Sequence, residues 1–277
     1  SAVSGVVNNL GLLTSVTNEV GTTWTYGYDA MGRLSSETAP VGDASAYNVK
    51  NLSFEQIPTA EYGLGANHCR QTITQGNAVT VNYFDARWRK RLTTTHDAAD
   101  PGGTRRMQLF NYDPHNRTVF ASYPTRSIAS ITATLAGTRT AYDALGRTTR
   151  TAADSELGVL QASTQYLGGF RTQVTNPRGY ITTTAYQAFD EPGESAVVSI
   201  ATPEGVSVGI NRDVFGKPLT ITRAGSDGTR VTRRYAYDAQ HRLCKTSEPE
   251  TGATVQFHDA AGNVAWRASG LSLPGPA

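Results

Sequence analysis

The sequence has little of what a disulfide framework or a membrane span requires. It contains only two cysteines in 277 residues, Cys69 and Cys244. They lie far apart along the chain, so a disulfide between them is not expected. No run of about 18 apolar residues occurs, which predicts no membrane-spanning segment. The N-terminus also lacks a charged region followed by an apolar one, so no signal peptide is predicted.

The features of a nucleic-acid binder or an enzyme are equally scarce. The 25 basic and 23 acidic residues nearly balance, and the basic residues are spread along the chain apart from a short cluster at residues 87–91. A clustered basic face is missing, so nucleic-acid binding is not expected. Five histidines occur without His-x-x-x-His or Cys-x-x-Cys spacing, which predicts no metal site. Phosphate-loop and nucleophile-elbow motifs are missing too, and we expect no cofactor and no catalysis.

What the sequence does have is one short pattern repeated along its length, as in residues 142–147, Tyr-Asp-Ala-Leu-Gly-Arg. Eight copies begin at Asp29, Asp85, Asp113, Asp143, Asp190, Asp213, Asp238 and Asp259. The position three residues later holds Gly32, Trp88, Asn116, Gly146, Gly193, Gly216, His241 and Gly262. Aromatic residues before the Asp and basic residues at the end of the motif include Tyr28, Arg33, Tyr112, Tyr142, Arg147 and Tyr237. Self-similarity at this scale is typical of a repeat architecture.

The motif is predicted to be a β-hairpin turn. Asp favours the first position of a type I turn, and the next left-handed position favours Gly, Asn or His. Trp88 should strain that position, and Pro192 falls at the disfavoured third turn position, so different loops are expected in those two copies. Repetition argues against catalytic carboxylates, because catalysis needs one distinctive pair. The Asp is therefore predicted to cap its turn, and the Arg to pair with a motif Asp or to cover a neighbouring aromatic ring.

The spacing predicts an array of hairpins. Successive motif Asp residues are mostly 21–30 residues apart, and two gaps of 56 and 47 residues indicate degenerate copies near Phe54–Pro58 and at residues 166–171. Alternating segments such as 22–28, 78–84 and 229–237 favour strands. The chain is thus predicted to be all-β, an array of antiparallel β-hairpins over residues 1–277 without a domain boundary. Residues 36–72 are expected to be irregular or an eroded repeat, 98–104 a loop and 271–277 a tail.

This Tyr-Asp-x-x-Gly-Arg array resembles the RHS or YD-repeat family over roughly residues 14–269. The family includes bacterial polymorphic toxins, shell components of insecticidal toxin complexes and wall-associated proteins. The resemblance implies a curved, spiralling β-strip that forms part of a hollow shell, often around a toxic C-terminal segment. It also implies a secreted or cell-surface location. The implied partner is the rest of the parent polypeptide, because the chain begins within the pattern and is expected to be a fragment.

Two functions follow from these observations. The first is a non-catalytic shell segment that encloses or displays another polypeptide, since repeats that stack gain stability only as an array. The second is a cell-surface module that binds a glycan, with Trp24, Tyr26 and Tyr28 as the candidate patch on one strand face. Ordinary cross-strand packing of aromatic residues accounts for the same three side chains.

Overall fold

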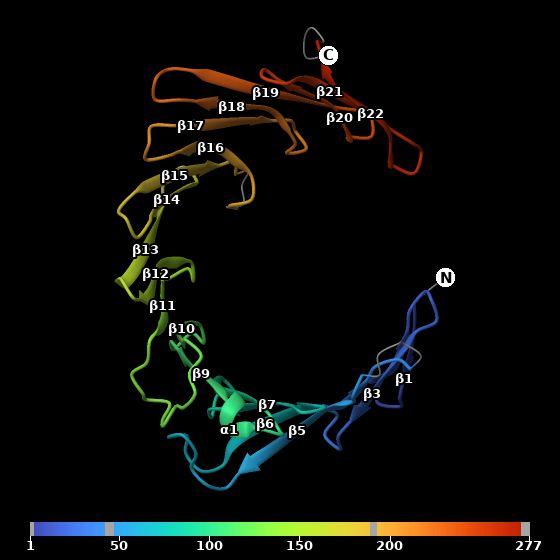
Figure 1. Ribbon diagram of the computed structural model, residues 1–277, viewed down its shortest axis with the longest axis vertical. Helices are drawn as coiled ribbons and strands as arrows, with labels where there is room; N and C mark the ends of the chain where they lie inside the picture. The colour runs from blue at the N-terminus through green and yellow to red at the C-terminus, as the bar shows by residue number, and fades with distance from the viewer. Residues whose placement is uncertain (1–2, 42–46, 189–192, 273–277) are drawn as a thin grey trace. The chain divides into compact units, whose positions relative to one another are not determined.

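The alternating, threonine-rich segments form strands throughout. The computed structural model describes residues 3–41, 47–188 and 193–272, and these residues form 22 strands and one helical turn (Figure 1). All strand pairings are antiparallel between strands that follow one another in the chain, for example β7 with β8 and β17 with β18. The predicted all-β class and hairpin arrangement are confirmed, and the predicted spiralling of the strip stays a prediction.

The chain divides into two compact units, Ser1–Ala141 with Ala152–Val159, and Tyr142–Thr151 with Leu160–Ala277. The first unit contains β1 (Ser4–Val7), β2 (Leu13–Thr17), β3 (Thr23–Tyr28), β4 (Leu34–Thr38), β5 (Lys50–Ile57), β6 (His68–Gln75), β7 (Ala78–Phe84), β8 (Lys90–Asp97), α1 (Pro101–Thr104), β9 (Arg106–Tyr112) and β10 (Thr118–Ser122). The residues of β11 (Gly137–Tyr142), β12 (Thr148–Ser155) and β13 (Gly158–Leu167) are divided between the units. The second unit contains β14 (Arg171–Thr175), β15 (Ile181–Tyr186), β16 (Val197–Ala201), β17 (Ser207–Arg212), β18 (Pro218–Ala224), β19 (Arg230–Tyr237), β20 (Leu243–Glu248), β21 (Gly252–His258) and β22 (Val264–Leu271).

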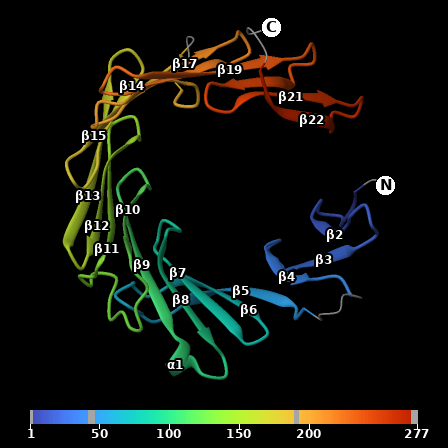
Figure 2. The same ribbon diagram turned by 45° about the horizontal axis from the view of Figure 1, so that its top comes forward.

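A small hydrophobic core lies on β7, β8 and β9, which run side by side in Figure 2. Two long excursions contribute to it, residues 58–67 and 123–136, and they are joined by a hydrogen bond of 2.7 Å from Ile131 N to Tyr62 O. Complete burial of a leucine contributes about 1.5–3 kcal/mol. The six buried members of the cluster are Leu64, Tyr83, Leu92, Met107, Leu109 and Ile128.

The second unit has no comparable core among its described residues. Only Thr172, Lys245 and Ala253 are buried there, and the other described side chains are half-buried or exposed. Its strands therefore gain little from hydrophobic burial, and strand pairing and contacts between hairpins must carry more of its stability.

Three sequence-based expectations differ from the structure or lie beyond it. The loop expected at residues 98–104 contains the helical turn α1, whose first turn is capped by Asp100 accepting from Gly103 N at 2.8 Å. Residues 36–72, expected to be irregular or an eroded repeat, contain β5 and the start of β6, which pair over eight residues from Lys50 to Ile57. Of the expected tail at 271–277, residues 273–277 lie outside the described residues, and Leu271 ends β22.

Candidate functional site

Seven of the eight motif turns have one shared hydrogen-bond pattern. At Asp143, the backbone N–H donates to Arg147 O at 2.9 Å, and Gly146 N donates back to Asp143 O at 3.1 Å. The Asp143 side chain then accepts from the N–H groups of Leu145 and Arg147, both at 2.9 Å. The backbone pattern recurs at Asp29, Asp85, Asp113, Asp213, Asp238 and Asp259. The eighth copy, at Asp190, lies outside the described residues, and Gly193 of that copy is exposed.

Six of the motif turns end in a bulge that sets the strand register. Tyr28 pairs with Leu34 and Tyr237 with Leu243, in each case with a one-residue register shift just before the aromatic residue. The same shift occurs at Phe84, Tyr112, Arg212 and His258. A type I turn closed by a left-handed residue and a bulge produces this register.

The left-handed position accepts more than glycine. Gly146 has φ 85°, and Asn116 and His241 occupy the same position at φ 67° and 60°. Trp88 also adopts this conformation, at φ 60°, and its turn keeps every backbone hydrogen bond of the pattern. The expectation of a different loop at Trp88 was therefore wrong, because the capping bonds of Asp85 outweigh the left-handed strain of about 1–2 kcal/mol. Pro192 lies outside the described residues.

The basic residue that ends a motif pairs with the Asp that begins it. Arg33 Nε lies 2.7 Å from Asp29 Oδ2, and Arg117 Nε lies 2.6 Å from Asp113 Oδ2. Arg89, Arg147 and Arg242 make the same pair with their own motif Asp.

Such contacts lower the pKa of six motif carboxyl groups, those of Asp29, Asp85, Asp113, Asp143, Asp238 and Asp259. For Asp29 and Asp238 the largest cause is the hydrogen bond from the backbone N–H of the residue four positions on, and partial burial opposes it. For Asp85, Asp113 and Asp143, partial burial is the largest single effect and raises the pKa, but the hydrogen bonds from the motif Arg together outweigh it. The turns are therefore built around ionised carboxylates at neutral pH.

The same basic side chain reaches the next motif along the chain. The Arg89 guanidinium lies 5.4 Å from the centre of the Tyr112 ring, and Arg89 Nη1 donates to the backbone carbonyl of Asp113 at 3.3 Å. In the second unit, the Arg147 guanidinium lies 3.9 Å above the Tyr166 ring, and Lys217 Nζ lies 5.1 Å from the Tyr237 ring. A cation over an aromatic face is attracted by the ring quadrupole.

The aromatic residue of the next motif completes the contact. Tyr112 donates its hydroxyl to Lys90 O at 3.0 Å, and Lys90 directly follows Arg89. Tyr237 donates in the same way to Pro218 O, and Tyr166 to Thr148 O, each at 3.0 Å. Burial raises the pKa of the Tyr166 and Tyr237 phenols, which keeps them protonated donors. We call this pair of contacts, cation over ring and hydroxyl to backbone, the inter-motif clasp.

Sequence reasoning missed two further turns. They begin at Asn8 and Asn18, whose amide oxygens accept the same two backbone N–H groups. Asn176 caps a third turn of this kind. At the weak copy near Phe54, the Arg33 guanidinium lies 4.8 Å from the Phe54 ring, which is the cation contact of a clasp without its hydroxyl bond. Asn-x-x-Gly was the available signal, because Asn caps turns as Asp does.

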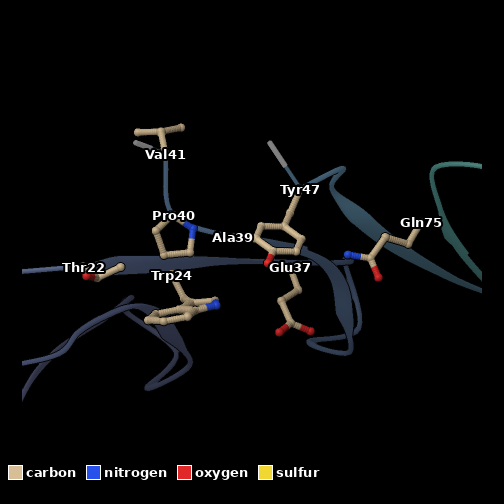
Figure 3. A pocket seen from close by; sticks show the side chains of 8 residues that line it. All are labelled: Thr22, Trp24, Glu37, Ala39, Pro40, Val41, Tyr47 and Gln75. Atoms are coloured by element: carbon tan, nitrogen blue, oxygen red, sulfur yellow. The ribbon is translucent and has the colours of Figure 1, made fainter. Parts of the chain in front are cut away.

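The three aromatic residues of the predicted patch lie on β3 and make different contacts. Trp24 lines a hollow of about 650 Å³, together with Tyr47, Glu37 and Gln75 among others. Figure 3 shows Trp24, Tyr47 and Glu37 beside one another. Tyr26 and Tyr28 are not among the residues that line this hollow, and the Tyr28 hydroxyl donates to Leu13 O at 2.7 Å.

Reactive groups are sparse over the described part of the chain. Residues 3–41, 47–188 and 193–272 hold no cluster of three or more His, Cys, Asp or Glu side chains that could bind a metal. Cys69 and Cys244 are free thiols in different units, and burial raises the pKa of Cys69. In the same described residues, none of the helical structure has the length and apolar character to cross a membrane.

One segment of the chain matches a known family of repeats. Residues 8–44 match the family model of the RHS repeat. The chain contains an RHS repeat. The matched segment includes the turns at Asn8, Asn18 and Asp29, and the hydrogen bonds of the Asp29 turn recur along the chain as far as Asp259. The resemblance inferred from the motif is confirmed. No curated protein matches the chain.

The solved structures that match the chain are distant in sequence. A crystal structure of TcdB2-TccC3 without its hypervariable C-terminal region is 12% identical, with a TM-score of 0.35, over 96% of this chain and 19% of that chain. A Tc holotoxin pore from Photorhabdus luminescens is 12% identical, with a TM-score of 0.33, over 96% of this chain and 19% of that chain. A porin-like protein from Bacteroides uniformis is 12% identical, with a TM-score of 0.22, over 96% of this chain and 92% of that chain. The chain thus spans about a fifth of the length of the toxin chains that it matches.

Proposed function

We propose that this chain is a non-catalytic wall segment of a secreted or cell-surface RHS-repeat protein, and that the wall encloses or displays another part of the same polypeptide. The observation that carries the proposal is the inter-motif clasp, which links neighbouring motifs at Tyr112, Tyr166 and Tyr237 through basic, aromatic and backbone groups. The motif Asp and Arg, which would be candidates for catalysis, are occupied with capping the turns and with these contacts. A repeat whose recurring chemistry joins it to its neighbours builds a surface rather than an active site.

The distribution of burial supports a wall. The buried side chains are concentrated on β7 to β9, and the described residues of the second unit are mostly half-buried or exposed on both faces. A sheet of this kind has two accessible faces, one for solvent and one for a partner. A partner from the same polypeptide would be present at high effective concentration and would need only weak contacts.

The complete gene product provides the test. It would be treated with trypsin under native conditions and again in mild urea, and the fragments identified by mass spectrometry. The proposal predicts a segment outside this array that resists trypsin in the native state, co-purifies with the array after any cleavage, and becomes sensitive when urea opens the hairpins. Equal sensitivity of every other segment in both conditions would contradict enclosure.

A second candidate function, glycan binding, is favoured by the hollow beside Trp24. Trp24 and Tyr47 supply aromatic faces on which a sugar ring can stack, and Glu37 and Gln75 supply polar groups at the same hollow. Glu37 is also held by Lys50, whose Nζ donates to it at 3.1 Å. A hollow of several hundred Å³ that is lined by a few polar groups suits a small sugar.

A glycan array separates the two functions. Trp24→Ala should abolish binding, and Trp24→Phe should retain part of it, because the aromatic face remains. Trp266→Ala is the matched control, since Trp266 is a half-exposed tryptophan in the other unit. Binding by the native chain that survives Trp24→Ala would exclude this hollow as the glycan site.

A further inference from the structure

One turn of the second unit departs from the pattern of the others. In the copy at residues 166–171, Leu167 stands where the other motifs have Asp. Leu167 pairs directly with Arg171, and the strands continue from there without the register shift of the other motifs. Arg171 Nε donates to Gly168 O at 3.0 Å instead of to a carboxylate. Within residues 3–41, 47–188 and 193–272, Arg171 has no acidic partner.

A second arginine lies beside this turn. Arg147 comes from the preceding motif, pairs with Asp143 through Nε at 2.7 Å and lies over Tyr166. In the clasp at Tyr112 the guanidinium also donates to the next motif's Asp carbonyl, from Arg89 Nη1 to Asp113 O at 3.3 Å. Among the described residues, Arg147 makes no such bond to Leu167.

The two arginines line one pocket of about 360 Å³, together with Tyr166, Tyr186, Phe170 and Glu194 among others. Phe170 has φ 53° and is 45% exposed. A bulky residue in the left-handed region carries about 1–2 kcal/mol of strain, and such strain is concentrated at functional sites. Glu194 lines the pocket without forming an ion pair to either arginine in the described structure.

We propose that this pocket binds a carboxylate attached to an apolar group. The carboxylate would take the place of the missing motif Asp and accept from Arg171 and Arg147, since a guanidinium fork matches a carboxylate in geometry and charge. The apolar group would lie against Phe170 and Tyr186. The pocket is large enough for a small organic acid or for the terminal residue of a peptide.

Ligand-observed NMR on the full 277-residue chain tests this proposal. Phenylacetate represents a free organic acid, and N-acetyl-phenylalanine represents a chain terminus. Saturable binding of either one supports the site, and the tighter of the two identifies the source of the carboxylate. Phenylacetamide has the same ring without the charge and should not bind. Binding of the amide as tight as that of the acid would overturn the proposal.

Variants locate the binding. Arg171→Gln should weaken binding about tenfold or more, because it removes a charged hydrogen-bond donor. Arg178→Gln is the matched control, since Arg178 is an exposed arginine in the next turn and does not line the pocket. Equal losses in the two variants, or none in Arg171→Gln, would contradict the assignment.

Two further variants change the charge of the pocket. Leu167→Asp supplies the carboxylate that the other motifs have, so this carboxylate should pair with Arg171 and abolish binding of the acid. Glu194→Gln should tighten binding of the acid, because it removes a negative charge from the pocket wall. Circular dichroism establishes that each variant is folded. Undiminished binding by folded Leu167→Asp would overturn the proposal, and if that variant does not fold, Arg171→Gln and the amide decide it.

Discussion

Replacing Gly146 by valine tests the turn geometry that repeats along the chain. Gly146 has φ 85°, a backbone conformation that residues with a β-carbon rarely adopt. The substitution therefore carries a conformational cost. A β-branched residue at positive φ costs roughly 1–2 kcal/mol or more. We expect Gly146→Val to lower the free energy of unfolding by that amount and Gly146→Asn to cost less, as Asn116 occupies the same position at φ 67°.

Urea unfolding measured by circular dichroism, with hydrogen exchange at residues 142–148 as a local measure, gives the comparison. Gly209→Val is the matched control. Gly209 lies within β17, where a built β-carbon meets no atom within 4 Å and the backbone is outside the positive-φ region. Its replacement should be neutral or stabilising, because valine favours strands. Equal stability of Gly146→Val and the native chain, with unchanged exchange in the hairpin, would refute the turn assignment.

Three more predictions concern the turns and clasps. Tyr112→Phe should cost about 0.5–1.5 kcal/mol in urea unfolding by deleting the hydroxyl bond to Lys90 O, whereas no change would show that water replaces it. Trp88→Asn should raise the unfolding free energy by about 0.5–1 kcal/mol by relieving left-handed strain, and a loss instead would show that contact of Trp88 with Phe84 dominates. The pKa of Asp238 is lowered on folding, so its contribution is complete above the unfolded value of about 3.9 and is lost as the pH falls below it. The free energy of unfolding of the native chain, measured from pH 5 to pH 2.5, should show this loss. The loss should be smaller in Asp238→Asn, whose amide keeps the turn cap as that of Asn18 does. An equal loss in the native chain and in the variant would contradict the role of the Asp238 carboxylate.

The repeated turns were predictable because their chemistry is local. Asp at the first turn position, Gly or Asn at the left-handed position and an Arg after it specify hydrogen bonds within five residues. The turn at Trp88 was wrongly predicted because the identity of one residue was weighed without the hydrogen bonds of the rest of the turn. Its left-handed strain is visible in the sequence, but the compensating bonds from Asp85 are a property of the whole turn.

The contacts between motifs were only partly predictable. The sequence indicated that an Arg would cover a neighbouring ring, but it could not specify that Arg147 lies over Tyr166 rather than another aromatic residue. The hollow beside Trp24 depends on Tyr47, which is 23 residues away and outside any motif. The pocket at Arg171 is defined by a missing Asp, and its significance appears only when the complete turns are seen beside it.

Electron cryo-microscopy of the complete gene product tests the wall function most directly. The account predicts that these hairpins form part of a continuous β-wall with density for another segment of the polypeptide against one face. It also predicts that the clasp residues Arg89 and Tyr112 remain in contact with each other between neighbouring motifs. Hairpins with both faces open to solvent, and no polypeptide against either face, would contradict the proposal that the chain is a shell segment.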